Sequence, residues 1–178
     1  SGKTTLLAIM AGLDLPSRGS VKLLDKEITS LNEDKRAQIR SKDVGFVFQS
    51  FHLLPRLSAL DNVMMPLEIL GAKDAKERAI KALDEVGLSK RTGHVPHQLS
   101  GGEKQRVAIA RAMVKAPSIL FADEPTGNLD QSSTDNILEL LLGINKQTKT
   151  TLVVVTHDQQ LASRSDMVFE LQEGKLKC

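Results

Sequence analysis

Leu120-Phe121-Ala122-Asp123-Glu124-Pro125-Thr126 is the stretch of this sequence that decides the fold. An apolar run over residues 119–122 ends in two adjacent carboxylates, and Pro125 and Gly127 then break the chain. Short apolar runs between chain-breaking residues are typical of buried strands in parallel sheets. Open α/β sheets bind ligands at the carboxyl ends of their strands, where Asp123 and Glu124 fall. Taken alone, the stretch also fits a solvated loop that carries two acids.

The two carboxylates suit different tasks. Side chains alternate along a strand, so Asp123 and Glu124 are expected to point to different sides. One position suits holding Mg²⁺, and the other suits polarising a water molecule. Because two charges at a strand end are costly without a nearby cation, a cationic partner is expected from elsewhere in the chain.

Composition narrows the class of protein. The 178 residues suffice for one domain with a substantial core, and the net charge of +2 is too small to favour nucleic acid or a membrane surface as partner. Trp and Tyr are absent, which leaves little aromatic surface for base stacking, and the single Cys178 excludes an intrachain disulfide. No apolar run reaches the roughly 20 residues of a spanning helix, so any membrane role depends on a partner chain.

Ser1-Gly2-Lys3-Thr4-Thr5 matches the end of a phosphate-binding loop, G-x-x-x-x-G-K-[ST]. In such loops backbone N–H groups and the following helix N-terminus surround phosphate, the Lys reaches the outer phosphates, and the next hydroxyl binds Mg²⁺. Lys3 and Thr4 fit these tasks, although Gly-Lys-Thr alone also fits a solvated helix start. The first glycine of the loop would precede residue 1, so we expect the sequence to be truncated within this loop.

Polar side chains also follow two other apolar runs. Gln49 follows residues 44–48, and His157 follows residues 151–156. If both runs are strands of one sheet, these side chains lie on the same rim as Asp123. A glutamine there can ligate Mg²⁺ or orient water, whereas in isolation Gln49 fits a loop amide and His157 a structural histidine.

A second candidate anion site precedes a helix expected at residues 104–115. In Leu99-Ser100-Gly101-Gly102-Glu103 a hydroxyl and unobstructed N–H groups lie at the positive end of the helix dipole. The alternative is an ordinary N-cap followed by flexible glycines. One chain rarely carries two such helix starts without using them.

Hydrophobic spacing predicts the remaining elements. We expect a hairpin or meander over residues 19–28 with Asp25 and Lys26 at its turn, and helices near residues 32–40, 57–70, 74–86 and 131–144. A last strand is expected at residues 167–171. Pro66 should kink or interrupt the second helix, and the third should pack through Ala79, Ile80, Leu83 and Val86. The apolar segment Phe51–Pro55 fits either local packing or a docking surface for a partner.

The order of motifs is more specific than any single motif. Gly-Lys-Thr, a glutamine after a strand and Leu-Ser-Gly-Gly-Glu are followed by Arg106-Val107-Ala108-Ile109-Ala110-Arg111-Ala112, Asp-Glu-Pro-Thr, Asn-Leu-Asp and a strand-end His. This series resembles the nucleotide-binding domain of ABC transporters over essentially the whole chain, and Ser-Gly-Gly is nearly diagnostic of that family. Residues 45–51 and 122–130 look like the ATP-binding subunits of lipoprotein-releasing and macrolide-exporter systems, although related importers share much of both.

The resemblance implies an α/β fold: a P-loop NTPase, ABC-type ATPase domain with a mostly parallel sheet flanked by helices. It implies a single domain over residues 1–178 with a small helical subdomain at about residues 55–115. The family's N-terminal strands, its adenine-stacking aromatic and the first half of the phosphate loop would precede residue 1.

The resemblance also implies ATP and Mg²⁺ as ligands and a set of site residues within one subunit. Lys3 and Thr4, with their neighbours Ser1, Gly2 and Thr5, would hold phosphate and Mg²⁺. Gln49 and Asp123 would attend Mg²⁺. Glu124 would act as general base toward water, and His157 would contact the γ-phosphate.

A head-to-tail dimer is implied as well, formed by identical or paired ATPase subunits with two ATP molecules between them. Ser100, Gly101 and Gly102 would close on the γ-phosphate held by the other subunit, and Asp130 would couple the two sites. The dimer would be cytoplasmic and peripheral on the inner face of the cell membrane, bound to an integral membrane permease and not to nucleic acid.

Two other functional classes, DNA-acting ATPases and non-hydrolytic interaction modules, fit the sequence less well. Soluble ABC-type ATPases that act on DNA insert long coiled coils before the signature, but here only two short helices lie between Gln49 and Leu99. The near-neutral charge also argues against DNA. A non-hydrolytic interaction module would have lost Glu124 or His157, and both are present. The sequence therefore favours an ATPase that powers transport.

Overall fold

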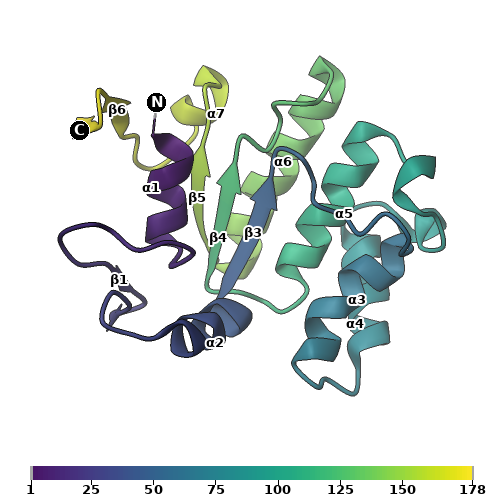
Figure 1. The fold of residues 1–178 in the computed structure, drawn as a ribbon. Coiled ribbons are helices and arrows are strands. Elements are labelled where there is room, and N and C mark those ends of the chain that lie inside the picture. The colour runs from purple at the N-terminus through teal and green to yellow at the C-terminus, as the bar shows by residue number, and fades with distance from the viewer. Residues whose placement is uncertain (1, 178) are drawn as a thin grey trace.

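A three-stranded parallel sheet organises the molecule, in a computed structural model that describes residues 2–177. The strand order is β3-β4-β5, and Phe46, Phe121 and Val153 lie side by side in register. All three strands expected from the apolar runs are therefore confirmed, although β5 is only partly buried, and their carboxyl ends meet at one edge of the sheet (Figure 1). The strands are β3 (Val44–Phe48), β4 (Ile119–Asp123) and β5 (Thr151–Val155).

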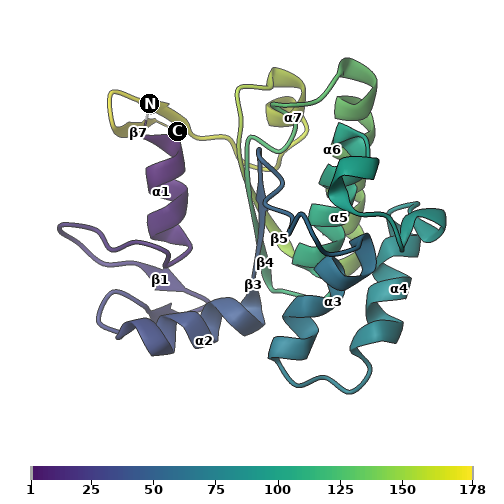
Figure 2. The same cartoon turned by 45° about the vertical axis from the view of Figure 1, so that its right-hand side comes forward.

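Helices cover both faces of this sheet, which gives the domain three layers (Figures 1 and 2). Side chains alternate along β4, so Phe121 packs on one face while Leu120 and Ala122 pack on the other. The Phe121 face is covered by α1 (Lys3–Met10) and α2 (Glu33–Asp43). The opposite face is covered by α5 (Gly101–Met113) and α6 (Gln131–Thr148).

A second apolar cluster lies beside the sheet, where α3 (Ala59–Ile69) and α4 (Ala75–Glu85) pack on α5. Pro66 was expected to kink or interrupt α3, and the helix is not interrupted there. Proline removes a single backbone donor here, and the buried neighbours Val63 and Leu67 hold the helix in place. The expectation for Ile80 was also wrong, since it is 45% exposed while Leu83 is fully buried.

Short elements complete the chain. The expected hairpin is confirmed, but its turn is Leu24–Asp25, one residue early, and both residues have positive φ as a two-residue hairpin turn requires. The strand expected at residues 167–171 begins later, at Glu170, and Met167, Val168 and Phe169 are exposed and lie outside any strand. These elements are β1 (Lys22–Leu23), β2 (Lys26–Glu27), α7 (Gln159–Ser163), β6 (Glu170–Gln172), β7 (Lys175–Lys177) and the 3₁₀ turns Ser89–Arg91 and Pro96–Gln98. Within residues 2–177, none of the helices combines the length and apolarity that a membrane crossing needs.

Candidate functional site

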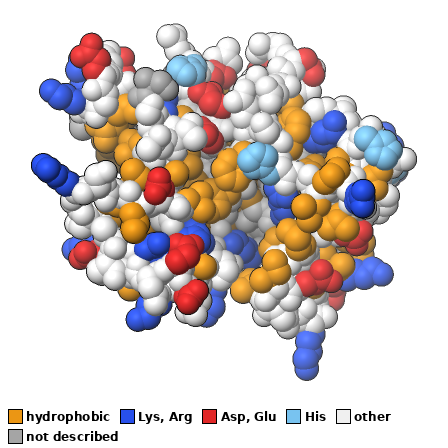
Figure 3. All heavy atoms as spheres, in the orientation of Figure 1, with side chains coloured by type: hydrophobic (Ala, Val, Ile, Leu, Met, Phe, Trp, Pro, Cys, Tyr) orange, Lys and Arg blue, Asp and Glu red, His pale blue; other side chains and the backbone are white. Residues whose placement is uncertain are grey.

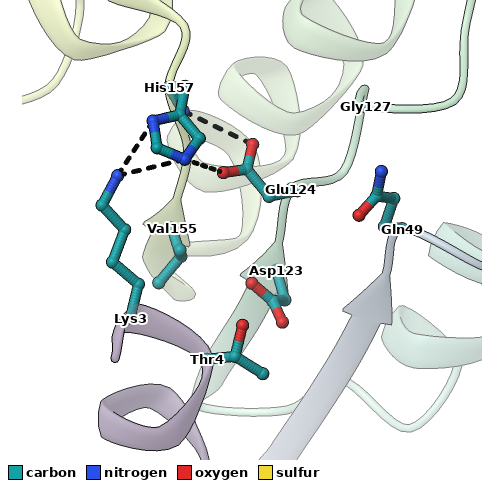
Figure 4. A pocket seen from close by; sticks show the side chains of 8 residues that line it. All are labelled: Lys3, Thr4, Gln49, Asp123, Glu124, Gly127, Val155 and His157. Atoms are coloured by element: carbon teal, nitrogen blue, oxygen red, sulfur yellow. Dashed lines mark hydrogen bonds and ion pairs between the residues drawn. The ribbon is translucent and has the colours of Figure 1, made fainter. Parts of the chain in front are cut away.

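One pocket lies where the carboxyl ends of β3, β4 and β5 meet the N-terminus of α1 (Figure 4). It is an open cavity of about 430 Å³. Six of the side chains singled out from the sequence line it together, although they come from segments as far apart as residues 3 and 157. The lining residues are Lys3, Thr4, Gln49, Asp123, Glu124, Gly127, Val155 and His157.

The N-terminus of α1 presents unused donors to this pocket. Its N-cap is Gly2, at φ +89°, so no side chain caps the first N–H groups of the helix. The first turn also carries no acid that would neutralise the helix dipole. The Lys3 ammonium adds a full positive charge at the same end, so the helix start favours an anion such as phosphate.

A chain of contacts joins the three charged or titratable groups of the pocket. The Lys3 Nζ atom lies 3.1 Å from His157 Nδ1, and His157 Nε2 lies 3.3 Å from Glu124 Oε1. An ammonium group can only donate, so His157 Nδ1 accepts and Nε2 carries the proton that faces Glu124. Among the described residues Lys3 forms no ion pair with Asp123 or Glu124, and its contact with the acids at the strand end runs through His157.

Glu124 is held firmly from its backbone. Its N–H donates to the Val155 carbonyl at 2.8 Å, and its φ of +45° is a left-handed conformation that non-glycine residues rarely adopt. Strained backbone of this kind persists where the surrounding structure fixes it. The carboxylate is 24% exposed, so one side of it can reach water while the other contacts His157.

The donors for a magnesium ion fit the pocket. Asp123 Oδ1 is buried and has no hydrogen-bond partner among the described residues, which is costly for a carboxylate unless a cation occupies that side. The Thr4 hydroxyl points toward Asp123, and the Gln49 side-chain oxygen also points into the pocket (Figure 4). Hard oxygen donors of these three kinds are the ligands that Mg²⁺ prefers.

The Ser100-Gly101-Gly102 segment does not line this pocket. Ser100 caps α5: its Oγ accepts from Glu103 N at 3.2 Å, and Glu103 Oε2 accepts from Ser100 N at 2.8 Å. Gly102 lies close to α6, since a Cβ there would be 2.9 Å from Ser133 Oγ and 3.2 Å from Ser133 Cβ. The second helix start is therefore an ordered capping box whose glycines pack on the start of α6 in the same chain.

Asp130 also lies outside the pocket, at the N-cap of α6. Its carboxylate accepts from Ser132 Oγ at 2.7 Å, Ser133 N at 2.9 Å and Ser133 Oγ at 2.9 Å. The Ser132 hydroxyl, followed by the Ser133 N–H and hydroxyl, lowers the pKa of Asp130 to about 2. Gly2 and Thr5 lie at the start of α1 without lining the pocket, and Ser1 lies outside the described residues.

The hydrogen bonds to Asp130 can be tested through the pKa of its carboxyl group. Ser132→Ala should raise the pKa of Asp130 from about 2 toward its ordinary value of 3.8, because the largest stabilising contact of the carboxylate is removed. Carboxyl ¹³C NMR shifts followed against pH measure this, and Ser163→Ala, whose hydroxyl bonds Gln160 O instead, is the control. Since the folded pKa lies below the ordinary value, this contact stabilises the fold above about pH 3.8 and is lost as pH falls through about 2. An unchanged pKa in Ser132→Ala would contradict the assignment.

Three residues near the site carried no role in the sequence analysis. Gln105 is fully buried in α5 and donates to the Pro125 carbonyl at 2.6 Å, directly behind Glu124. Arg111 donates to the carbonyls of His52 and Phe51 at 2.6 and 2.9 Å. Asn128 contacts Gln49. Of these three residues, Gln105 alone has a sequence signal: it is a polar residue at a helix position that otherwise faces the core.

Known proteins share this architecture. The ABC transporter family model matches residues 1–127. The lipoprotein-releasing system ATP-binding protein LolD of Legionella pneumophila (strain Paris) is 52% identical over 178 residues, covering 99% of this chain and 78% of that protein. The uncharacterized ABC transporter ATP-binding protein YbbA of Escherichia coli (strain K12) is 52% identical over 179 residues, with the same coverage of 99% and 78%.

Solved structures agree. The dimeric bacterial ABC transporter cassette MJ0796 has a TM-score of 0.89 and 39% identity, covering 99% of this chain and 79% of that chain. The same cassette in a post-hydrolysis dimer bound to ADP and Pi has a TM-score of 0.89 and 38% identity, and the match again covers 99% of this chain and 79% of that chain. The α/β fold with a parallel sheet is thus that of an ABC ATPase cassette. Because the family model matches well over half of the chain and relatives align along almost its whole length, this chain belongs to the ABC transporter family as an ATP-binding subunit.

Proposed function

We propose that this chain hydrolyses ATP in the pocket at the carboxyl ends of β3, β4 and β5, and that this reaction powers a transporter of the lipoprotein-releasing type. The single observation that carries the proposal is the convergence of a lysine, three oxygen donors for Mg²⁺ and a carboxylate that contacts a histidine. LolD, which resembles this chain at 52% identity, is named as the ATP-binding protein of such a system. The chain's short α3 and α4 contain no coiled coil of the kind that DNA-acting ATPases insert.

In this proposal each side chain has one task. Lys3 and the free N–H groups of α1 neutralise phosphate charge, and Thr4, Gln49 and Asp123 hold Mg²⁺. When bound, Mg²⁺ would offset the negative charge that develops on the phosphate groups. Glu124 accepts a hydrogen bond from the attacking water as general base. The N–H group at Nε2 of His157 donates to the Glu124 carboxylate and keeps it oriented before nucleotide binds. When nucleotide binds, the Lys3 ammonium leaves His157 and contacts phosphate instead.

The proposal includes a head-to-tail dimer. In the segment Ser100–Gly102, the Ser100 hydroxyl is exposed at the N-terminus of α5 and lies outside the pocket of its own chain, so its O–H group can donate to a phosphate held by a second subunit. The solved MJ0796 cassettes that this chain resembles are dimeric. We propose that residues 55–115 act as a helical subdomain that carries this segment, because α3, α4 and α5 share an apolar cluster of their own.

A membrane permease is the proposed partner that places the dimer on the cytoplasmic face of the membrane. The segment after Gln49 supplies the contact surface, because Leu54 is 40% exposed and hydrophobic side chains gather on this face near α3 (Figure 3). Arg111 fixes the Phe51 and His52 carbonyls, and Asn62 bonds both backbone groups of Leu54. The surface is therefore rigid and joined directly to the Mg²⁺ ligand Gln49.

Leu54→Glu tests the permease surface. It should reduce the permease retained on the tagged subunit at least about tenfold, because an anchoring apolar side chain is replaced by a charge that must be desolvated. ATP turnover of the subunit without permease should stay unchanged, since Leu54 is outside the pocket. A permease of the lipoprotein-releasing type is co-expressed with the tagged subunit and quantified after affinity purification.

Ile69→Glu is the matched control, because Ile69 is 73% exposed at the other end of α3. Equal retention of permease by wild type and Leu54→Glu would remove this surface from the proposal. Absence of Mg²⁺-dependent ATP hydrolysis in the wild-type protein would instead overturn the ATPase itself.

A further inference from the structure

Asn128 makes a reciprocal pair of hydrogen bonds with Gln49, although the two residues are 79 positions apart. Gln49 Nε2 donates to Asn128 Oδ1 at 3.2 Å, and Asn128 Nδ2 donates to the Gln49 backbone carbonyl at 3.0 Å. Asn128 lies in the loop that leads from Glu124 to Asp130. The pair therefore joins the end of β3 to the loop that follows the proposed general base.

The pair fixes which end of the Gln49 amide faces the pocket. A backbone carbonyl oxygen can only accept, so the Asn128 NH₂ group must point to it. The Asn128 Oδ1 atom is then left facing the Gln49 side chain, where it can only accept from an NH₂ group. Gln49 must turn its Nε2 toward Asn128 and its oxygen toward Asp123, which is the orientation in Figure 4.

Gly127 leaves the space that this arrangement needs. A Cβ at position 127 would lie 2.7 Å from Gln49 Nε2 and 3.1 Å from Gln49 Cδ. Any side chain there would push the Gln49 amide out of its place. Residues 127 and 128 thus act together: one allows the amide to lie against the loop, and the other sets its direction.

We propose that Asn128 is a positioning residue that holds the Gln49 side-chain oxygen toward Mg²⁺. The inference rests on the proposed function, which places Gln49 among the Mg²⁺ ligands. The reverse orientation of the amide would direct two N–H donors at a cation, which costs both a ligand and an electrostatic repulsion. Asn128 does not line the pocket, and both hydrogen bonds of its side chain go to Gln49, so it acts on the metal through that residue.

Asn128→Leu tests the proposal, because leucine keeps the approximate size and removes both hydrogen bonds. The complete protein with bound ATP is titrated with Mn²⁺ at low temperature, and free Mn²⁺ is measured by its EPR signal. The dissociation constant for Mn²⁺ should rise about three- to tenfold, the scale of losing one or two neutral hydrogen bonds. ATP binding measured in EDTA should stay unchanged, because Asn128 does not contact the α1 phosphate site.

Asn136→Leu is the matched control. Asn136 is an exposed asparagine on α6 whose Nδ2 bonds the Ser132 carbonyl at 2.8 Å, so its loss removes a similar hydrogen bond away from Gln49. This variant should bind Mn²⁺ as the wild type does. If Asn128→Leu fails to give a cooperative melt, Asn128→Ala replaces it and the same three- to tenfold rise is expected.

A double variant separates this role from a general structural effect. In the Gln49→Ala background, Asn128→Leu should weaken Mn²⁺ binding no further, because the residue through which Asn128 acts is gone. Additive losses, or wild-type Mn²⁺ affinity in both Asn128 variants, would overturn the role of Asn128. Wild-type Mn²⁺ affinity in Gln49→Ala alone would instead show that Gln49 is no metal ligand, which is a failure of the proposed function.

Discussion

Glu124→Gln is expected to bind ATP normally and to hydrolyse it at least about a hundred-fold more slowly than the wild type, the usual scale for loss of a general base. The substitution keeps the size of the side chain and removes only its negative charge and basicity. Glu124 is held by its backbone bond to Val155 at 2.8 Å, and the His157 side chain that its carboxylate contacts is 80% exposed, so this contact contributes little to folding. The effect should therefore fall on turnover and leave the thermal melt nearly unchanged.

Because ATP is bound but not cleaved, the same variant should accumulate as an ATP-bound dimer on a sizing column. Single-turnover hydrolysis and column elution with and without ATP are the two measurements. Glu68→Gln, on the exposed part of α3, is a suitable control and should behave as the wild type does. Near-normal turnover in Glu124→Gln would remove Glu124 from the role of general base.

The sheet could be predicted from the sequence because its strands are short apolar runs, buried along most of β3 and β4 and half-buried along most of β5. Residues 119–122 and 151–155 are almost entirely apolar, and few other structures accommodate such short runs between chain breakers. Elements at the periphery were harder to predict, because their placement depends on neighbours. Ile80 fits the apolar spacing of α4 but faces solvent, and Met167–Phe169 is apolar yet outside any strand.

The site followed from the same reasoning only in part. Parallel strands bring their carboxyl ends to one edge, so Gln49, Asp123 and His157 were expected together and line one pocket. Contacts that depend on side-chain geometry leave no periodic signal. The pairing of Asn128 with Gln49 is one example, and the burial of Gln105 behind Glu124 is another. The dimer came from the family resemblance and not from any pattern of residues.

A mixture of Lys3→Ala subunits with Ser100→Arg subunits is expected to hydrolyse ATP although each variant alone is inactive. Lys3 lies in the pocket, whereas Ser100 lies outside it at the N-terminus of α5. If Ser100 completes the pocket of the other subunit, a mixed dimer has both lesions in one composite site and leaves the second site intact. With random pairing, half of the dimers are mixed and one of their two sites works, so activity should reach about a quarter of that of the wild type.

The reverse arrangement of the same lesions gives the opposite result. A subunit that carries both Lys3→Ala and Ser100→Arg, paired with a wild-type subunit, places one lesion in each composite site. Purified through two different affinity tags, this mixed dimer should be nearly inactive, whereas a subunit that works alone would retain half of its activity. Mixing Lys3→Ala with Glu124→Gln is the control, because it leaves no intact site in either arrangement. Activity in the doubly substituted mixed dimer, together with none in the first mixture, would show that Ser100 serves its own subunit and that the shared site is wrong.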